Sequence, residues 1–183
     1  TPRTVSSAAS DVYKRQSCNS LTEGINQLSL LSKIFPENPN EYKGNILAFY
    51  ALILYTGLLI WRSTIHLLFW EFGLHDIANV MPIKGSPDPM NLIYLFFSLW
   101  GLEQVIRTGL TIMVLIKYRG FIPLMLLINI FEWGLRGIYP LTDFFPSLNP
   151  DYTNGVTPGA EGVPYILIFL VISLILSLRT KKN

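Results

Sequence analysis

The sequence predicts an all-α integral membrane protein, built as an antiparallel, up-and-down bundle of four membrane-spanning helices. Of the 183 residues, 50% are hydrophobic and only 14% are charged, whereas a soluble domain usually carries about 25% charged residues. Four apolar segments approach the length of about 20 residues that a helix needs to cross a bilayer. Lys and Arg are concentrated in alternate flanks of these segments, as in multi-pass membrane proteins.

Each predicted helix has a recognisable start. Asp88 is expected to cap the second helix, with Pro89 as its first residue, because a short acceptor side chain and then proline suit a helix N-terminus. Pro123 falls in the first turn of the third helix and Pro164 opens the fourth, positions at which proline costs little. The four helices are predicted over residues 45–69, 91–116, 120–138 and 163–178.

The orientation follows from the positive-inside rule, which places Lys and Arg of short flanks on the cytoplasmic side. One set of flanks carries Lys33, Lys43, Lys117, Arg119, Arg179, Lys181 and Lys182. The other set carries only Lys84, and residues 139–163 contain acidic but no basic side chains. We therefore expect a multi-pass protein of the cytoplasmic (inner) membrane with both termini in the cytoplasm, and residues 139–163 outside the bilayer.

The segments before and after the helices are assigned separately. Residues 1–17 are Ser/Ala-rich and aperiodic, with no initiator Met, and we expect a non-native leader of the kind produced when adapter sequence is translated. Residues 18–44 form a cytoplasmic N-terminal segment, in which residues 21–35 are either a short interfacial helix or an irregular tail. Residues 179–183 are a cytoplasmic basic tail.

Composition and motifs argue against several classes of function. The net charge of +2 gives no electrostatic support for a nucleic-acid partner. The single cysteine, Cys18, excludes an internal disulfide, and no catalytic GxSxG, HExxH or P-loop pattern is present. No cofactor is indicated. The group His66, Glu71, His75 and Asp76 has no known metal-ligand spacing, so we predict no metal site, and we expect Asp76 to begin a short helix on the membrane surface.

The strongest indication of function is a set of polar residues at membrane depth. The fourth segment has no charged, histidine or amide side chain, and the other three carry Arg62, His66, Glu103, Gln104, Arg107, Asn129, Glu132 and Arg136. Burying the five charged side chains unpaired would cost on the order of 12–17 kcal/mol. Counting 1.5 Å per residue from the cytoplasmic ends puts both glutamates about 18–20 Å up, with Arg107 about 14 Å up. A single layer between the first three helices is therefore expected, with the fourth helix packed outside it.

Helical spacing predicts pairing within this layer. Glu103 and Arg107, like Glu132 and Arg136, are four residues apart with Glu first, the favourable order on a helix. Three Arg and two Glu leave a net charge of +1, which suits an anionic or carbonyl-bearing ligand. The four tryptophans, Trp61, Trp70, Trp100 and Trp133, are expected to include anchors at the membrane interface.

Several functions fit this layer. It could bind a small anion, a quinone-like molecule or a lipid head group without catalysing a reaction. The charges could instead fix helix packing in an accessory subunit of a membrane complex or a homo-oligomer. A third alternative is a small oligomeric, proton-coupled transporter with Glu103 or Glu132 as the proton carrier.

The four short-looped helices, with WRSTIH late in the first and WGLEQVIRTGL in the second, resemble the DoxX-like group of small bacterial membrane proteins. The resemblance covers about residues 45–178. It implies a quinone-related or respiratory accessory role and supplies no catalytic residues.

Overall fold

The computed structural model describes residues 30–138, 141–142 and 149–179. Helices dominate this described part, and strand-like pairing within it is limited to one isolated bridge between Val80 and Thr153. The predicted leader lies outside the described residues, as does most of the candidate interfacial helix. Of that candidate helix, residues 30–35 are described, and residues 30–34 are helical.

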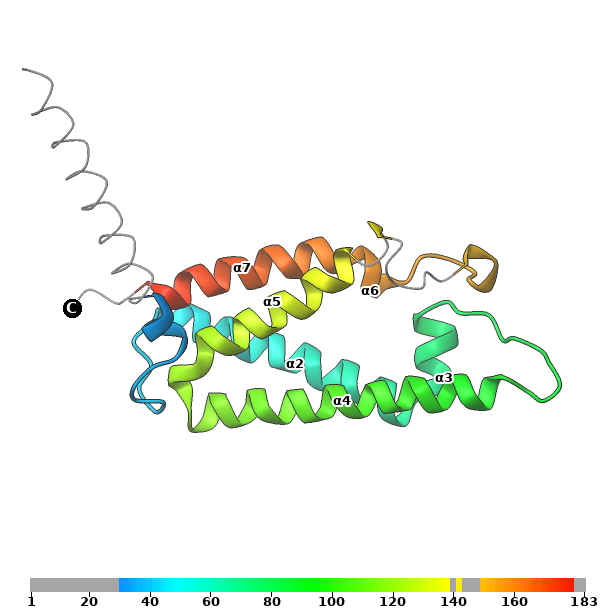
Figure 1. Cartoon of the computed structure of the whole chain (residues 1–183), viewed down its shortest axis with the longest axis horizontal. Helices are drawn as coiled ribbons and strands as arrows, with labels where there is room; N and C mark the ends of the chain where they lie inside the picture. The colour runs from blue at the N-terminus through cyan, green and yellow to red at the C-terminus, as the bar shows by residue number, and fades with distance from the viewer. Residues whose placement is uncertain (1–29, 139–140, 143–148, 180–183) are drawn as a thin grey trace, which may run out of the picture.

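Four long helices run along the long axis of the molecule (Figure 1). They are α2 (Ile46–Leu68), α4 (Met90–Ile116), α5 (Ile122–Ile138) and α7 (Val163–Leu178). Their bounds agree with the predicted segments within two residues. Three helical stretches are long and apolar enough to cross a membrane, namely Ile46–Leu68, Met90–Ile116 and Arg119–Ile138, whereas α7 is apolar but shorter, with 16 residues.

The helix starts are formed by local hydrogen bonds. The Asn45 side chain accepts from the Leu47 backbone N–H of α2 at 2.9 Å. Asp88 accepts from the Met90 N–H at 2.9 Å, although Pro89, rather than Asp88, occupies the N-cap position. Between α5 and the preceding helix, Arg119–Phe121 forms a 3₁₀ turn, so α5 begins two residues later than predicted.

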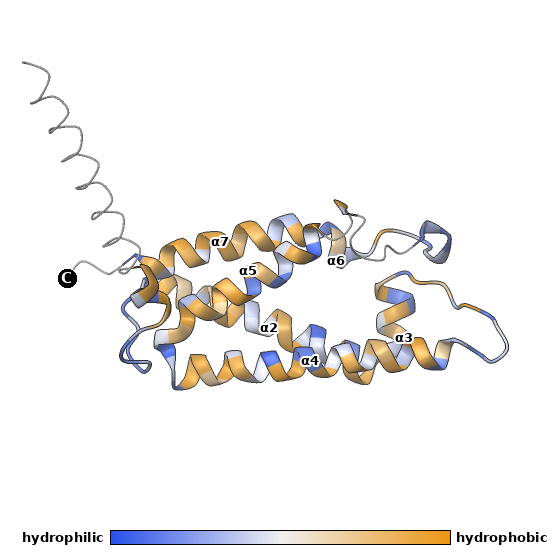
Figure 2. Ribbon diagram, in the orientation of Figure 1, coloured by the Kyte–Doolittle hydropathy of each residue, from blue (hydrophilic) through white to orange (hydrophobic). Residues whose placement is uncertain are grey.

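The long helices pack mainly in pairs. α4 lies against α2, α5 lies against α7, and α2 also contacts α7, while α4 and α5 touch each other sparsely. Gly101 explains the close approach of α4 to α2, because a Cβ at this position would lie 2.5 Å from the Leu67 backbone nitrogen. The buried core includes Leu52, Leu126 and Leu170. Figure 2 shows apolar residues along all four helices, and many remain exposed, as expected for helices that face lipid.

The loops at one end of the molecule pair with each other. The Met81 N–H donates to Tyr152 O at 2.8 Å, and the Asn154 N–H donates to Asn79 O at 2.9 Å. The Thr157 hydroxyl adds a bond to Ala78 O at 2.9 Å. Residues 149–157 are thus attached to the loop that follows the first long helix.

A short helical stretch comes before this paired loop. It consists of α3 (Trp70–Phe72) and a π-helical turn over Gly73–Ile77. The expectation that Asp76 begins a helix was wrong, because Asp76 lies near the end of that turn. Within residues 149–157, the other paired segment, a 3₁₀ turn covers Pro150–Tyr152, and α6 (Pro158–Glu161) then leads into α7.

Candidate functional site

Three arginines from three different helices surround one carboxylate, that of Glu132 on α5. Arg107 of α4 and Arg136 of α5 both donate hydrogen bonds to it. Arg62 of α2 lies within ion-pair distance, with its Nη1 3.6 Å from Glu132 Oε1. We call these four residues the Glu132 cluster. Because the cluster joins α2, α4 and α5, it ties together helices that pack mainly in other pairs.

The positions of Arg107 and Glu132 along their helices explain why the two side chains meet. Arg107 lies nine residues before the end of α4 at Ile116, and Glu132 lies ten residues after the start of α5 at Ile122. The two residues therefore lie at similar distances along their helices from the turn that joins α4 to α5. The prediction that Glu103 is level with Glu132 stays a prediction, and it is Arg107, one turn further along α4, that donates to Glu132.

Glu103 lies at the edge of the cluster. Its carboxylate is 3.7 Å from Arg107 Nε, and 60% of its side chain is exposed, compared with 23% for Glu132. Both predicted four-residue ion pairs are therefore present, but they differ in their surroundings. Glu132 pairs within the protein, whereas Glu103 pairs on its outer surface.

Two tryptophan rings lie beside the guanidinium groups of Arg62 and Arg136. The guanidinium carbons of Arg62 and Arg136 both lie 5.1–5.2 Å from the ring centroids of Trp100 and Trp133. This is the range of cation–π attraction. Trp133 is 2% exposed, and its indole N–H donates to the Tyr55 hydroxyl at 2.6 Å.

The sequence reasoning missed this role of the tryptophans. Trp133 is buried rather than an interface anchor. A signal was present, because Trp133 directly follows Glu132, and Trp100 lies one helical turn before Glu103 and Gln104.

The remaining predicted polar residues flank the cluster. The Gln104 amide donates to His66 Nδ1 at 2.7 Å, and the His66 ring stacks on Trp100 with centroids 4.6 Å apart. Asn129 donates to Met125 O at 2.7 Å and accepts a long bond of 3.4 Å from Arg107. Of the eight predicted residues, the structure gathers seven around Glu132 and Trp100, with Glu103 outside.

The cluster holds more hydrogen-bond donors than acceptors. Three guanidinium groups face one inner carboxylate, which leaves a formal charge of +2, or +1 when Glu103 is counted. Within the described part of the chain, several buried polar atoms around it have no hydrogen-bond partner: Arg62 Nη1, Arg107 Nε and Nη2, Arg136 Nε, and Gln104 Oε1. Two of them, Arg62 Nη1 and Arg107 Nε, lie within the longer ion-pair distance of Glu132 and Glu103. Arginine N–H groups bind carboxylate, phosphate and carbonyl oxygens, so the unpaired donors suit an acceptor-rich ligand.

No metal-binding group of three His, Cys, Asp or Glu side chains occurs among the described residues. Among His66, Glu71, His75 and Asp76, the residues considered above as metal ligands, His75 already has neighbours at both ring nitrogens. Nδ1 lies 2.6 Å from Val80 O and Nε2 lies 2.7 Å from the Tyr94 hydroxyl. His75 therefore stabilises the loop after the π-helical turn.

Comparison with protein-family models, curated proteins and solved structures found no match for the chain. The resemblance to the DoxX-like group therefore stays a prediction. Function has to be argued from the geometry of the Glu132 cluster.

Proposed function

We propose that this chain is a non-enzymatic, four-helix protein of the bacterial cytoplasmic membrane that binds a small anionic or quinone-like ligand, or a lipid head group, at the Glu132 cluster. One observation carries the proposal: buried guanidinium N–H groups outnumber the acceptors around them. At membrane depth an unsatisfied donor is costly. A ligand oxygen would satisfy these donors and offset the excess positive charge.

The chemistry of the cluster narrows the class of ligand. A carboxylate, a phosphate or a quinone carbonyl would accept from Arg62, Arg107 and Arg136. Gln104 Oε1 accepts no hydrogen bond from the described residues, and it suits a hydroxyl group on the same ligand. Trp100, which is 38% exposed, adds an aromatic surface beside the cluster, and this favours a planar ring.

The membrane arrangement in this proposal is an antiparallel bundle in which α7 makes the fourth crossing. A helix of 16 residues spans about 24 Å, less than the roughly 30 Å hydrocarbon core of a bilayer. Local thinning of the bilayer accommodates such a difference at modest cost. The bias of Lys and Arg supports cytoplasmic termini.

The alternative function is an accessory subunit in which the cluster only fixes helix packing. The observation that favours it is that Glu132 already contacts all three arginines. Buried ion pairs of this kind can serve register and packing without binding a ligand. The two functions differ in what happens when one arginine is removed.

Native mass spectrometry of the purified full-length protein tests the proposal. The wild type should retain a co-purifying molecule, or bind an added short-chain quinone or octanoate. The Arg62→Ala variant should bind at least about tenfold more weakly, as expected for loss of a charge-assisted hydrogen bond. Its unfolding temperature should stay close to that of the wild type.

Arg179→Ala is the matched control, because Arg179 is exposed and lies at the other end of the bundle. It should leave ligand retention unchanged. An accessory role predicts a different pattern, in which no ligand is retained by the wild type and Arg62→Ala fails to fold.

A further inference from the structure

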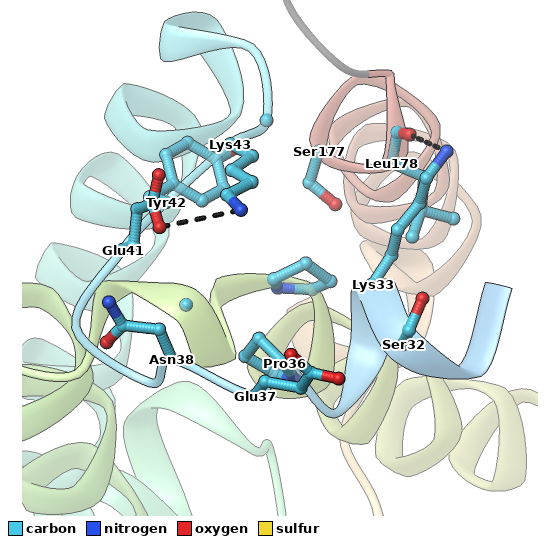
Figure 3. A pocket seen from close by; sticks show the side chains of 13 residues that line it. Ser32, Lys33, Pro36, Glu37, Asn38, Glu41, Tyr42, Lys43, Ser177 and Leu178 are labelled. Carbon is cyan, nitrogen blue, oxygen red and sulfur yellow. Dashed lines mark hydrogen bonds and ion pairs between the residues drawn. The ribbon is translucent and has the colours of Figure 1, made fainter. Parts of the chain in front are cut away.

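A cavity of about 540 Å³ lies at one end of the molecule, away from the Glu132 cluster, which lies further along the helices. Three distant parts of the chain enclose it: residues 32–44 before α2, the start of α5, and the end of α7 (Figure 3). Its volume is in the range of small-molecule sites. We call it the end pocket, and it plays no part in the function proposed above.

Backbone contacts hold the walls of the end pocket together. The Gly120 N–H donates to Pro39 O at 2.8 Å, and the Asn45 N–H donates to Leu176 O at 3.3 Å. Gly44 allows a very close approach, since a Cβ there would lie 2.2 Å from Ser177 O. These contacts fix the three segments to one another through the backbone.

The charged side chains that line the pocket balance one another: Lys33, Lys43, Glu37 and Glu41. Lys33 Nζ donates to Leu178 O at 3.0 Å, at the C-terminal end of α7. Lys43 and Glu41 form an ion pair of 3.5 Å whose side chains are 70% and 53% exposed, so the pair is weak and open to exchange. Glu37 makes no hydrogen bond or ion pair with the described residues. The lining thus offers two cations and two anions, with one carboxylate free.

The position of the end pocket indicates where its ligand comes from. It lies where α2 and α5 begin and α7 ends, next to the boundaries of the apolar helices (Figure 1). Basic side chains gather at this end, including Lys117, Arg119 and Arg179. In a membrane, the ends of apolar helices coincide with the lipid head groups.

We propose that the end pocket binds the head group of a zwitterionic phospholipid with a primary ammonium, phosphatidylethanolamine, from the leaflet in which α2 and α5 begin. The lipid phosphate lies against Lys33 and Lys43, and the ammonium donates to Glu37 and Glu41. A purely anionic head group would face two carboxylates. A quaternary ammonium has no N–H to donate and prefers an aromatic cage, whereas Tyr42 alone among the lining residues is aromatic.

Competitive native mass spectrometry tests this assignment. The delipidated full-length protein is mixed with equal amounts of phosphatidylethanolamine, phosphatidylcholine and phosphatidylglycerol that have matched acyl chains. The wild type should retain phosphatidylethanolamine about tenfold more than either other lipid, as expected for the added charge-assisted hydrogen bonds. Glu37→Gln should lower this preference to near parity. The matched control Glu71→Gln, at an exposed glutamate of α3, should keep it.

Four results would overturn the proposal. Preferential retention of phosphatidylglycerol would indicate a simple anion site. Equal retention of the three lipids would indicate no head-group recognition. An unchanged preference in Glu37→Gln would place the lipid elsewhere. Displacement of the lipid by an equal concentration of free phosphoethanolamine would assign the pocket to a soluble zwitterion, because a bound lipid should also gain from its acyl chains.

Discussion

The hydrogen bond from Arg107 to Glu132 joins α4 to α5, two helices that otherwise touch each other sparsely. Arg107 is 9% exposed and Glu132 is 23% exposed, so the pair lies largely inside the protein. The same carboxylate also holds Arg136 and lies near Arg62. Glu132 is therefore the carboxylate that connects the charged side chains of three helices.

Replacing Glu132 with Gln should destabilise the protein strongly. The variant leaves three arginines without their inner carboxylate, and breaking a buried pair in this way typically costs about 3–5 kcal/mol. Chemical unfolding in detergent measures the loss. Glu103→Gln is the control and should cost less than about 1 kcal/mol, because Glu103 is mostly exposed. Equal losses of unfolding free energy in the two variants would show that the buried ion pairs of Glu132 stabilise the protein no more than the exposed pair of Glu103.

A methyl group at Gly101 should separate α4 from α2. The new Cβ would lie 2.5 Å from Leu67 N and 2.6 Å from His66 C, both of which are backbone atoms that cannot move aside cheaply. Gly101→Ala should therefore lower stability by about 1–3 kcal/mol or more. Gly109→Ala lies on the same helix and meets nothing within 4 Å, so it should be neutral or stabilising by up to about 1 kcal/mol. Thermal unfolding that ranks the two variants in the reverse order would contradict this packing.

The bond between Trp133 and Tyr55 should appear as an energetic coupling. Tyr55→Phe leaves the indole N–H of a buried Trp133 unpaired, which costs about 1–3 kcal/mol. Trp133→Phe removes the donor together with ring area beside Arg62 and Arg136. In a double-mutant cycle, the second substitution should cost less once the first is made. Fully additive losses would indicate that the bond contributes nothing.

Tyr42 should make the protein less stable at high pH. Its hydroxyl donates to Asn45 O at 2.9 Å, and burial raises the pKa of Tyr42 above its ordinary value of 10.0. The folded state then keeps a proton that the unfolded chain releases, so stability falls as the pH rises past about 10. The Tyr42 contribution is at most about 1.4 kcal/mol per pH unit.

Unfolding midpoints between pH 8 and pH 11 measure this effect. Tyr42→Phe should flatten the decline above pH 10, whereas Tyr165→Phe, at a tyrosine that is 75% exposed, should follow the wild type. A decline that is identical in all three proteins would assign the pH sensitivity to other groups.

The proposed orientation can be tested by labelling single cysteines in a Cys18→Ser background. Asp151→Cys lies in the loop attached to residues 78–81, and Asn40→Cys lies before α2; both positions are exposed. With cytoplasmic termini, an impermeant maleimide should label Asp151→Cys in intact spheroplasts and Asn40→Cys only after permeabilisation. The opposite pattern would reverse the orientation.

Much of the helical framework could be predicted from the sequence, because its signals are local. Apolar runs, proline positions and cap residues located α2, α4, α5 and α7 within two residues. The four-residue spacing of Glu132 and Arg136 likewise predicted their pair, since helical geometry alone brings them together.

The tertiary structure decided how far each helix is shifted along the bundle axis relative to its neighbours. Spacing along the sequence determines the face of the helix on which a side chain lies. The position of that helix along the bundle axis depends on turns and close contacts elsewhere in the chain. The 3₁₀ turn before α5 and the close contact of Gly101 with α2 are two such features. In the folded protein Arg107 meets Glu132, and Glu103 stays outside.

The same reason applies to the buried Trp133–Tyr55 bond and to the end pocket. The two bonded residues are 78 positions apart, and the walls of the pocket come from residues between 32 and 178. The sequence by itself determined which helices form and which of them carry charge. Only the packing of residues that are far apart in the sequence decided which charges meet. The free energy that favours these contacts comes from interactions between helices, not from interactions within one helix.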